Sequence, residues 1–201
     1  MVGCPEMRSF TDRRLRQRVE PAGPEKIYIS RSGLFRKRGR FLMEDYIEAK
    51  MEAEGYTVFH PQDHDLETQL SWYKGASAIV STDNSALHLA AFVINPHCKI
   101  GILLRRPGAI FADFEMQLKW FAGVQPDVID ACTRFWFRAD EKVQYNEVYA
   151  LIDFEKTAQA LKAAGIIENA NWVNPSIVDV DRAIEKLEAD MQSDEVRETV
   201  E

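Results

Sequence analysis

Apolar residues recur at two different spacings along the middle of the chain. Short runs rich in β-branched and aromatic residues predict strands at residues 26–30, 56–60, 78–81 and 99–104. The segments between them carry apolar residues at helical spacing and predict helices at residues 44–54, 66–75 and 85–93. This alternation predicts an α/β fold, with a parallel, Rossmann-like sheet covered by helices on both faces.

The flanking regions predict three parts in the chain. Residues 1–25 form a basic N-terminal segment or linker helix, and prolines and a glycine at its end predict a break. Residues 26–170 form the Rossmann-like domain, with further helices predicted at 111–121 and 153–164 and a strand at 134–137. Residues 171–201 form a C-terminal helix, at 180–192, and an acidic tail.

The charge of the chain is unevenly distributed. Its 201 residues carry a net charge of -7, which argues against a bulk nucleic-acid binder. The first eighteen residues nevertheless hold five arginines: Arg8, Arg13, Arg14, Arg16 and Arg18. Such a run is either solvated helix surface or a basic arm that docks on a partner or an anionic membrane.

Three cysteines, spaced far apart, indicate a reducing compartment rather than a disulfide framework. No apolar run approaches the roughly 20 residues of a membrane span, and arginines interrupt any N-terminal signal sequence. We therefore expect a cytoplasmic protein.

Polar and basic residues follow the predicted strands. Ligands of open parallel sheets bind beyond the carboxyl ends of the strands. Six cations follow the first and fourth strands: Arg31, Arg36, Lys37, Arg38, Arg105 and Arg106. Guanidinium groups match phosphate oxygens in two-point geometry, so this edge predicts a diphosphate or another anion, the alternative being solvated loop charges.

The turn 81–85 is the second candidate feature, because Asn84 and Ser85 are good residues to begin a helix. The N–H groups of that first turn bind a phosphate oxygen, or the two residues only cap the helix. His60 and His64 flank Pro61 in a loop, which disfavours a helical metal pair. The aromatic residues between 111 and 137 belong to the core or a contact between lobes, or form an acceptor platform.

Residues 26–104 resemble the C-terminal lobe of glycosyltransferase family 61, which includes bacterial capsular polysaccharide enzymes. The matching pieces, in order, are Tyr28-Ile29-Ser30-Arg31, Arg40, Glu44, Gly55-Tyr56-Thr57-Val58, Gln69, Ala76 to Val80, and Ser85-Ala86-Leu87. Two positions depart from the family pattern. Met43 stands where the family usually has asparagine, and Asp83-Asn84 where it has His-Gly.

Residues 83–91 are also similar to the D-[ST]-G-x-M-H-L-A turn of the heptosyltransferase family, with His88-Leu89-Ala90 matching literally. Both families share the two-lobed fold called GT-B. The resemblance therefore implies one lobe of a GT-B enzyme that transfers a sugar from a nucleotide-sugar donor to a glycan acceptor in polysaccharide biosynthesis.

The resemblance also implies roles for individual residues. Arginines would stabilise the leaving diphosphate, together with the helix start and without an obligatory metal or other cofactor. The implied donor-binding residues are Arg31, Arg38, Arg40, Glu44, Gln69, Asn84, Ser85, Ala86 and His88. Among them, Glu44 and Gln69 would order the loop or contact the nucleoside. Asp83 would contact the sugar or act as the base.

Two alternatives stay open. Because the acceptor binds mostly to the N-terminal lobe, we expect that lobe to be missing or supplied by a partner chain. The chain is then either part of an active transferase or a non-catalytic nucleotide-binding or interaction remnant. An unrelated Rossmann-like kinase or methyltransferase is disfavoured by the absence of a P-loop and an early glycine-rich turn.

Overall fold

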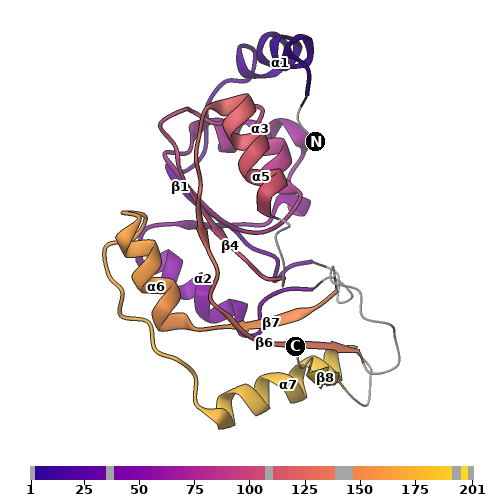
Figure 1. The fold of residues 1–201 in the computed structure, drawn as a ribbon, viewed down its shortest axis with the longest axis vertical. Coiled ribbons are helices and arrows are strands. Elements are labelled where there is room, and N and C mark those ends of the chain that lie inside the picture. The colour runs from indigo at the N-terminus through magenta and orange to yellow at the C-terminus, as the bar shows by residue number, and fades with distance from the viewer. Residues whose placement is uncertain (1–2, 35–38, 107–110, 139–146, 192–195, 199–201) are drawn as a thin grey trace.

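The computed structural model describes residues 3–34, 39–106, 111–138, 147–191 and 196–198 of the chain. A five-stranded parallel sheet forms its centre, in the order β2-β1-β3-β4-β5 (Figure 1). The strands are β1 (Lys26–Ile29), β2 (Thr57–Phe59), β3 (Ala78–Thr82), β4 (Lys99–Leu103) and β5 (Asp127–Ile129). The predicted α/β fold with a parallel, Rossmann-like sheet is thus confirmed, with β5 as a strand that the pattern did not predict.

Alternate side chains of the strands pack into two separate hydrophobic cores, one on each face of the sheet. In β1, Ile27 and Ile29 point to one face of the sheet and Tyr28 to the other, and all three are fully buried. Helices α2 (Glu44–Ala53) and α6 (Phe154–Ala163) cover the Tyr28 face. Helices α3 (Leu66–Gly75), α4 (Ala86–Ala90) and α5 (Phe111–Gln117) cover the other face.

The helix boundaries follow from local chemistry. Asp65 caps α3 by accepting a hydrogen bond from the Thr68 N–H (2.8 Å), and Asp153 caps α6 in the same way from the Lys156 N–H (2.9 Å). Gly55 ends α2 with φ at 81°, a conformation that costs glycine little. Helix α4 has only five residues and is shorter than the predicted segment 85–93.

A second, antiparallel sheet lies beside the first, in the order β7-β6-β8. Its strands are β6 (Cys132–Arg138), β7 (Tyr149–Ile152) and β8 (Val196–Glu198), so the strand predicted at 134–137 falls within β6. The segment before α2 is tied to β7 by the Leu42 N–H, which donates to the Ala150 carbonyl (2.8 Å), and by the Ala150 N–H, which donates to the Arg40 carbonyl (3.1 Å). This contact fixes the start of α2 against the second sheet.

The N-terminal segment packs onto the same face as α3 and α5. Helix α1 (Pro5–Thr11) continues into a π-helical turn, η1 (Asp12–Arg16), at one end of the long axis of the molecule (Figure 1). Arg16 of η1 donates to the Phe121 carbonyl (2.7 Å), and Leu15 packs against the core beneath. At the C-terminal end, helix α7 (Ile177–Met191) buries Val180 and Leu187 in the other core. Among the described residues, no helix has the length and apolar character of a membrane span.

Met43, the residue before α2, has a left-handed backbone with φ at 61° and ψ at 39°. Among the described non-glycine residues it is alone in having a positive φ. A side chain with a Cβ pays roughly 1–2 kcal/mol for this conformation, which glycine adopts freely.

We therefore expect the Met43→Gly variant to be more stable than Met43→Ala by about 1 kcal/mol, the reverse of the usual order near a helix. Urea unfolding of both variants measures the difference. The two remove the same methionine contacts, so their comparison isolates the backbone. An alanine variant at least as stable as the glycine variant would contradict the strain at this residue.

Candidate functional site

A pocket of about 360 Å³ opens at the carboxyl ends of β1, β2 and β3. In this strand order, β1 has β2 on one side and β3 on the other, so the chain reverses its winding direction between β1 and β3. Open α/β sheets bind their ligands at this switch point. We call this the switch-point pocket. It is lined by Ile29, Ser30, Arg31, Leu34, Pro61, Gln62, Gln69, Asn84, Ser85, Ala86 and Leu89.

The structure brings five of the predicted donor-binding residues together in this pocket: Arg31, Gln69, Asn84, Ser85 and Ala86. They come from the loop after β1, from α3, and from the turn after β3 with the start of α4. These segments are far apart in sequence but meet at one sheet edge. Leu34 and Leu89 add an apolar part that was not predicted. Leu89 follows from the helical phase of α4, because it lies three residues after Ala86 on the same side.

Asn84 holds the turn between β3 and α4. Its side-chain oxygen accepts from the Ala86 N–H (2.8 Å), and its amide donates to the hydroxyls of Ser81 (2.8 Å) and Thr82 (3.0 Å). The next N–H groups are also used, since Leu87 donates to the Asn84 carbonyl and His88 to the Ser85 carbonyl. Asn84 thus caps this short helix start, whereas the Ser85 side chain forms no capping hydrogen bond. A phosphate would have to displace the internal hydrogen bonds of the turn.

Gln69 fixes the loop that follows β2. Its side-chain amide donates to the carbonyls of Pro61 (2.7 Å) and His64 (2.9 Å). Asp65 at the start of α3 lies in the same loop. Gln69 thus lines the pocket and also orders the segment that brings Gln62 to it.

Glu44 is buried at the start of α2 behind the Arg31 turn, with 3% of its surface exposed. Its Oε1 accepts from the Arg31 N–H (2.8 Å), and the hydroxyls of Tyr28 (3.4 Å) and Ser30 (3.3 Å) lie at longer range. Its Oε2 is buried without a hydrogen-bond partner in the described part of the chain. Burial raises the pKa of Glu44 to about 7, against the opposing effect of the Arg31 N–H. The neighbouring Glu48 carboxylate contributes to this rise in the pKa.

The side chains of Arg31 and Arg40 brace the same loop. Arg31 donates from Nε to the Gly39 carbonyl (2.8 Å), and Arg40 donates to the Ser32 carbonyl (2.8 Å), which lies close to the Arg31 turn.

Arg31 lines the switch-point pocket. Arg40 and Glu44 instead line a second pocket of about 500 Å³ between the loop, Tyr149 and α7. Arg36, Lys37 and Arg38, which the sequence places in the basic edge, lie outside the described residues.

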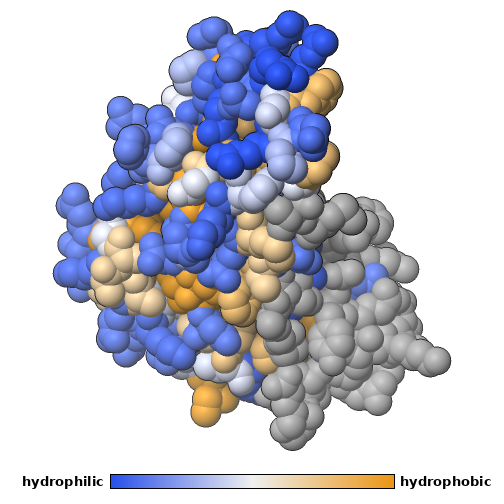
Figure 2. All heavy atoms as spheres, turned by 45° about the horizontal axis from the view of Figure 1, so that its top comes forward, coloured by the Kyte–Doolittle hydropathy of each residue, from blue (hydrophilic) through white to orange (hydrophobic). Residues whose placement is uncertain are grey.

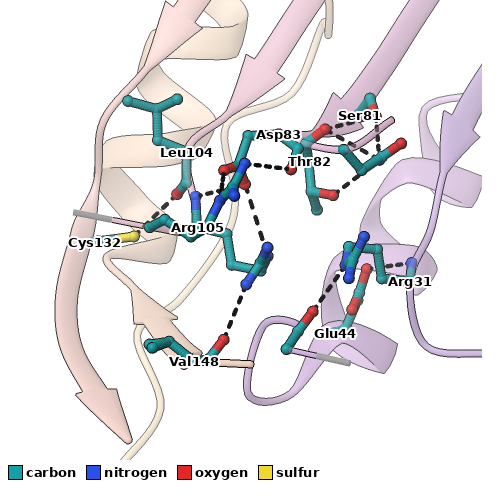
Figure 3. A network of polar contacts seen from close by, with 12 residues as sticks. Arg31, Glu44, Ser81, Thr82, Asp83, Leu104, Arg105, Cys132 and Val148 are labelled. Carbon is teal, nitrogen blue, oxygen red and sulfur yellow. Dashed lines mark hydrogen bonds and ion pairs between the residues drawn. The ribbon is translucent and has the colours of Figure 1, made fainter. Parts of the chain in front are cut away.

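Asp83 is the centre of a buried ion-pair network (Figure 3). It is 2% exposed, as is Arg105, whose Nε lies 3.7 Å from the Asp83 Oδ1. The Arg105 N–H donates to the same oxygen (3.2 Å), and Arg106 forms an ion pair and hydrogen bond with Oδ2. Both carboxylate oxygens of Asp83 therefore contact an arginine. This setting does not suit the predicted role in contacting the sugar or acting as a base, since Asp83 is buried and is not among the residues that line the switch-point pocket.

Arg105 is held from its other side by the second sheet. Its guanidinium donates to the Val148 carbonyl (3.0 Å), just before β7. Burial lowers the pKa of Arg105 to about 10, while the Asp83 carboxylate opposes the shift, so the side chain stays charged at neutral pH. Two of the six cations predicted for the basic edge thus contact Asp83.

Comparison with known proteins identifies a family match for the segment that contains the pocket. Residues 4–101 match the model of the family Glycosyltransferase 61. This segment is a glycosyltransferase 61 domain. It contains every residue that lines the switch-point pocket, together with Asp83, whereas Arg105 and Arg106 lie beyond it. Among curated proteins, none matches the chain. The family implies transfer of a glycosyl group from a donor to an acceptor.

The left-handed Met43 gives a physical reason for the asparagine at that position in the glycosyltransferase 61 pattern. Asparagine tolerates this backbone region better than most residues with a side chain. Methionine at this position keeps the conformation but loses that tolerance.

His88 lies outside the pocket of the glycosyltransferase 61 domain. Its Nδ1 is 2.5 Å from the Gln117 Oε1, and its ring stacks on Phe114 with centroids 4.6 Å apart. The side chain therefore joins α4 to α5, although its sequence neighbours Ala86 and Leu89 line the pocket. The prediction that His88 contacts the donor is not supported by this orientation.

The described residues include no candidate cluster of metal ligands. They contain no group of three or more histidine, cysteine, aspartate or glutamate side chains arranged to hold an ion. His64, one of the two histidines around Pro61, stacks on Phe59 with centroids 4.9 Å apart.

Proposed function

We propose that the switch-point pocket binds a nucleotide-sugar donor, and that the chain takes part in transferring its sugar to a glycan acceptor during polysaccharide biosynthesis. The observation that carries the proposal is the coincidence of a pocket at the β1/β3 switch point with a glycosyltransferase 61 domain. Its volume of about 360 Å³ lies within the range of small-molecule sites.

Arg31 is the residue we propose for the leaving diphosphate. It supplies the positive charge of the described pocket lining, and Glu44 and Gly39 fix its backbone and side chain. Negative charge grows on the diphosphate as the bond to the sugar breaks. A guanidinium fixed in advance stabilises that charge without reorganising, which is usually the largest catalytic contribution.

The remaining lining fits the nucleoside. Ile29, Leu34 and Leu89 provide apolar surface for the base, and Gln62 and Gln69 provide amide groups that can orient it. Such a mixture of apolar walls with a few polar groups is typical of cofactor and substrate pockets.

We further propose that the acceptor and its base come from another lobe or a partner chain, within a two-lobed GT-B arrangement. No aspartate, glutamate or histidine is present among the described residues that line the pocket. Deprotonation of an acceptor hydroxyl needs such a group within hydrogen-bond reach. Asp83, whose oxygens are engaged by two arginines, would instead support the wall behind the pocket.

The proposal predicts thermal stabilisation of the purified chain by one nucleotide class among UDP, GDP, CMP, ADP and their sugars. A ligand at about 100 times its dissociation constant adds roughly 2.7 kcal/mol to the free energy of unfolding. Arg31→Ala should abolish the shift by removing the phosphate contact. Ser85→Trp should abolish it by filling the pocket, and the exposed position of Ser85 lets the unliganded protein tolerate the larger residue.

The matched control is Arg182→Ala, which removes an exposed arginine from the second pocket and should keep the shift. If no nucleotide stabilises the folded protein, the donor-binding proposal fails. That outcome would favour an interaction remnant.

A further inference from the structure

The outward face of α1 and η1 combines exposed apolar and basic side chains. Met7 is 47% exposed and Phe10 is 54% exposed, and both are large apolar residues. Arg13 and Arg14 are exposed beside them, and the Arg14 guanidinium lies over the Phe10 ring at 5.9 Å. We call these four residues the α1 face.

The opposite side of the same helix is anchored to the protein. Thr11 is buried, and Leu15 packs against the core below α3 and α5. Arg16 donates to the carbonyls of Phe92 (3.4 Å) and Phe121 (2.7 Å). The helix therefore cannot roll to hide Met7 and Phe10, and the α1 face stays directed to the outside.

Charge separates this end from the rest of the molecule. Residues 5–18 carry five arginines against two acidic residues, a net charge of +3, in a chain whose net charge is -7. This segment lies at one end of the long axis (Figure 1). Figure 2 shows hydrophilic residues dominating that end, with apolar side chains at its border.

We propose that the α1 face docks on an anionic lipid surface. Arginines near such a surface are attracted to lipid phosphates, and a phenylalanine and a methionine at helical spacing can enter the boundary between headgroups and acyl chains. The acidic remainder of the chain is repelled by the same surface, which orients the molecule with α1 towards it. The inference does not depend on the proposed sugar transfer.

A lipid surface fits this face better than a protein partner does. A stable protein interface buries about 800 Å² on each side. A single face of a twelve-residue helical segment at the tip of the molecule offers much less. A bilayer needs no complementary shape, only negative charge and a boundary that accepts apolar side chains.

Sedimentation of the full chain with lipid vesicles tests the proposal. Vesicles of phosphatidylcholine with about 30% phosphatidylglycerol should pellet most of the protein at about 50 mM salt. Pure phosphatidylcholine vesicles, or about 500 mM salt, should lower the pelleted fraction at least about fivefold, because the attraction is screened within a Debye length. Protein that stays in solution with the anionic vesicles, or binds both vesicle types equally, would overturn the proposal.

Two double variants locate the contact. Arg13→Glu with Arg14→Glu reverses the charge of the two exposed arginines, and Met7→Ser with Phe10→Ser removes the apolar part; each should lower pelleting at least about fivefold. The controls on α7 make the same kinds of change and should leave it unaltered: Arg182→Glu with Lys186→Glu, and Ile177→Ser with Val178→Ser. Circular dichroism confirms that each variant is folded.

If the α7 variants lose binding equally, the contact does not lie on α1. Light scattering could instead find that the original protein is a dimer and that the α1 variants are monomers. Without vesicle binding, that result would assign the α1 face to a second copy of the chain.

Discussion

Replacing Asp83 with alanine is expected to lower the free energy of unfolding by about 3–5 kcal/mol, because it leaves the buried Arg105 guanidinium without its counter-charge. Arg105 is 2% exposed, so bulk solvent does not replace the lost carboxylate. Its remaining hydrogen bond, to the Val148 carbonyl, does not neutralise a charge. The β3, β4 and β7 ends all meet at this network, so the loss should loosen the edge that carries the switch-point pocket (Figure 3).

Urea unfolding at neutral pH measures this effect. The matched control is Asp127→Ala at the start of β5, where the side chain is exposed and a change within about 0.5 kcal/mol is expected. The double variant Asp83→Leu with Arg105→Met should recover part of the lost stability, since apolar pairs often replace buried ion pairs well. If Asp83→Ala proves as stable as the control but abolishes sugar transfer, the catalytic role predicted from the sequence would be supported over the structural one.

The central sheet could be predicted from the sequence because its signals are local. Each strand up to β4 is a short apolar run between breakers, and each helix repeats its apolar residues along one side. Helix α3 has the predicted bounds, since Asp65 caps its start and Gly75 closes its end. The order of the strands determines where their carboxyl ends meet, so Arg31, Gln69 and the 84–86 turn could be placed near one another.

The second sheet could not be predicted in the same way. All four residues of β7 are buried, so the strand lacks the alternation that marks a half-exposed one. Its pairing with β6 joins residues 13 to 20 positions apart, and its bridge to Phe41 reaches across more than half of the chain. Helix α4 was predicted too long because its apolar composition continues past residue 90, where turns replace the helix and the N–H groups of Phe92 and Val93 donate to carbonyls three residues earlier.

The sequence also could not predict the directions in which individual side chains of the site point. His88 shares a five-residue helix with Ala86 but faces α5, because only one side of α4 borders the pocket. Asp83 follows a strand that ends at the pocket, yet it contacts the two arginines after β4 and does not line the pocket. Spacing identifies the segment that reaches a site, and packing decides which of its residues point into it.

The Glu44→Gln variant is expected to be more stable than the original protein at pH 8, although it removes a residue of the family pattern. Burial raises the pKa of Glu44 from its usual 4.5 to about 7, so the folded state binds a proton more tightly than the unfolded state. Its contribution to stability is complete below about pH 4.5 and is lost as the pH rises through about 7. A neutral glutamine of the same shape avoids this loss, which is on the order of 3 kcal/mol for a shift of this size.

Urea unfolding of both proteins between about pH 4.5 and pH 8 measures this difference, which should grow with pH and vanish at the acidic end. Glu52→Gln, on the exposed side of α2, is the matched control and should show no such growth.

The groups that surround Glu44 oppose one another: Arg31 and Arg40 favour its charged form, whereas Glu48 disfavours it. An anionic donor at Arg31 would neutralise part of the favourable field, so nucleotide binding should draw a proton to Glu44 and weaken as the pH rises above 7. A glutamine variant less stable than the original protein at pH 8 would instead mean that the folded state needs the charge of this carboxylate to hold the Arg31 turn.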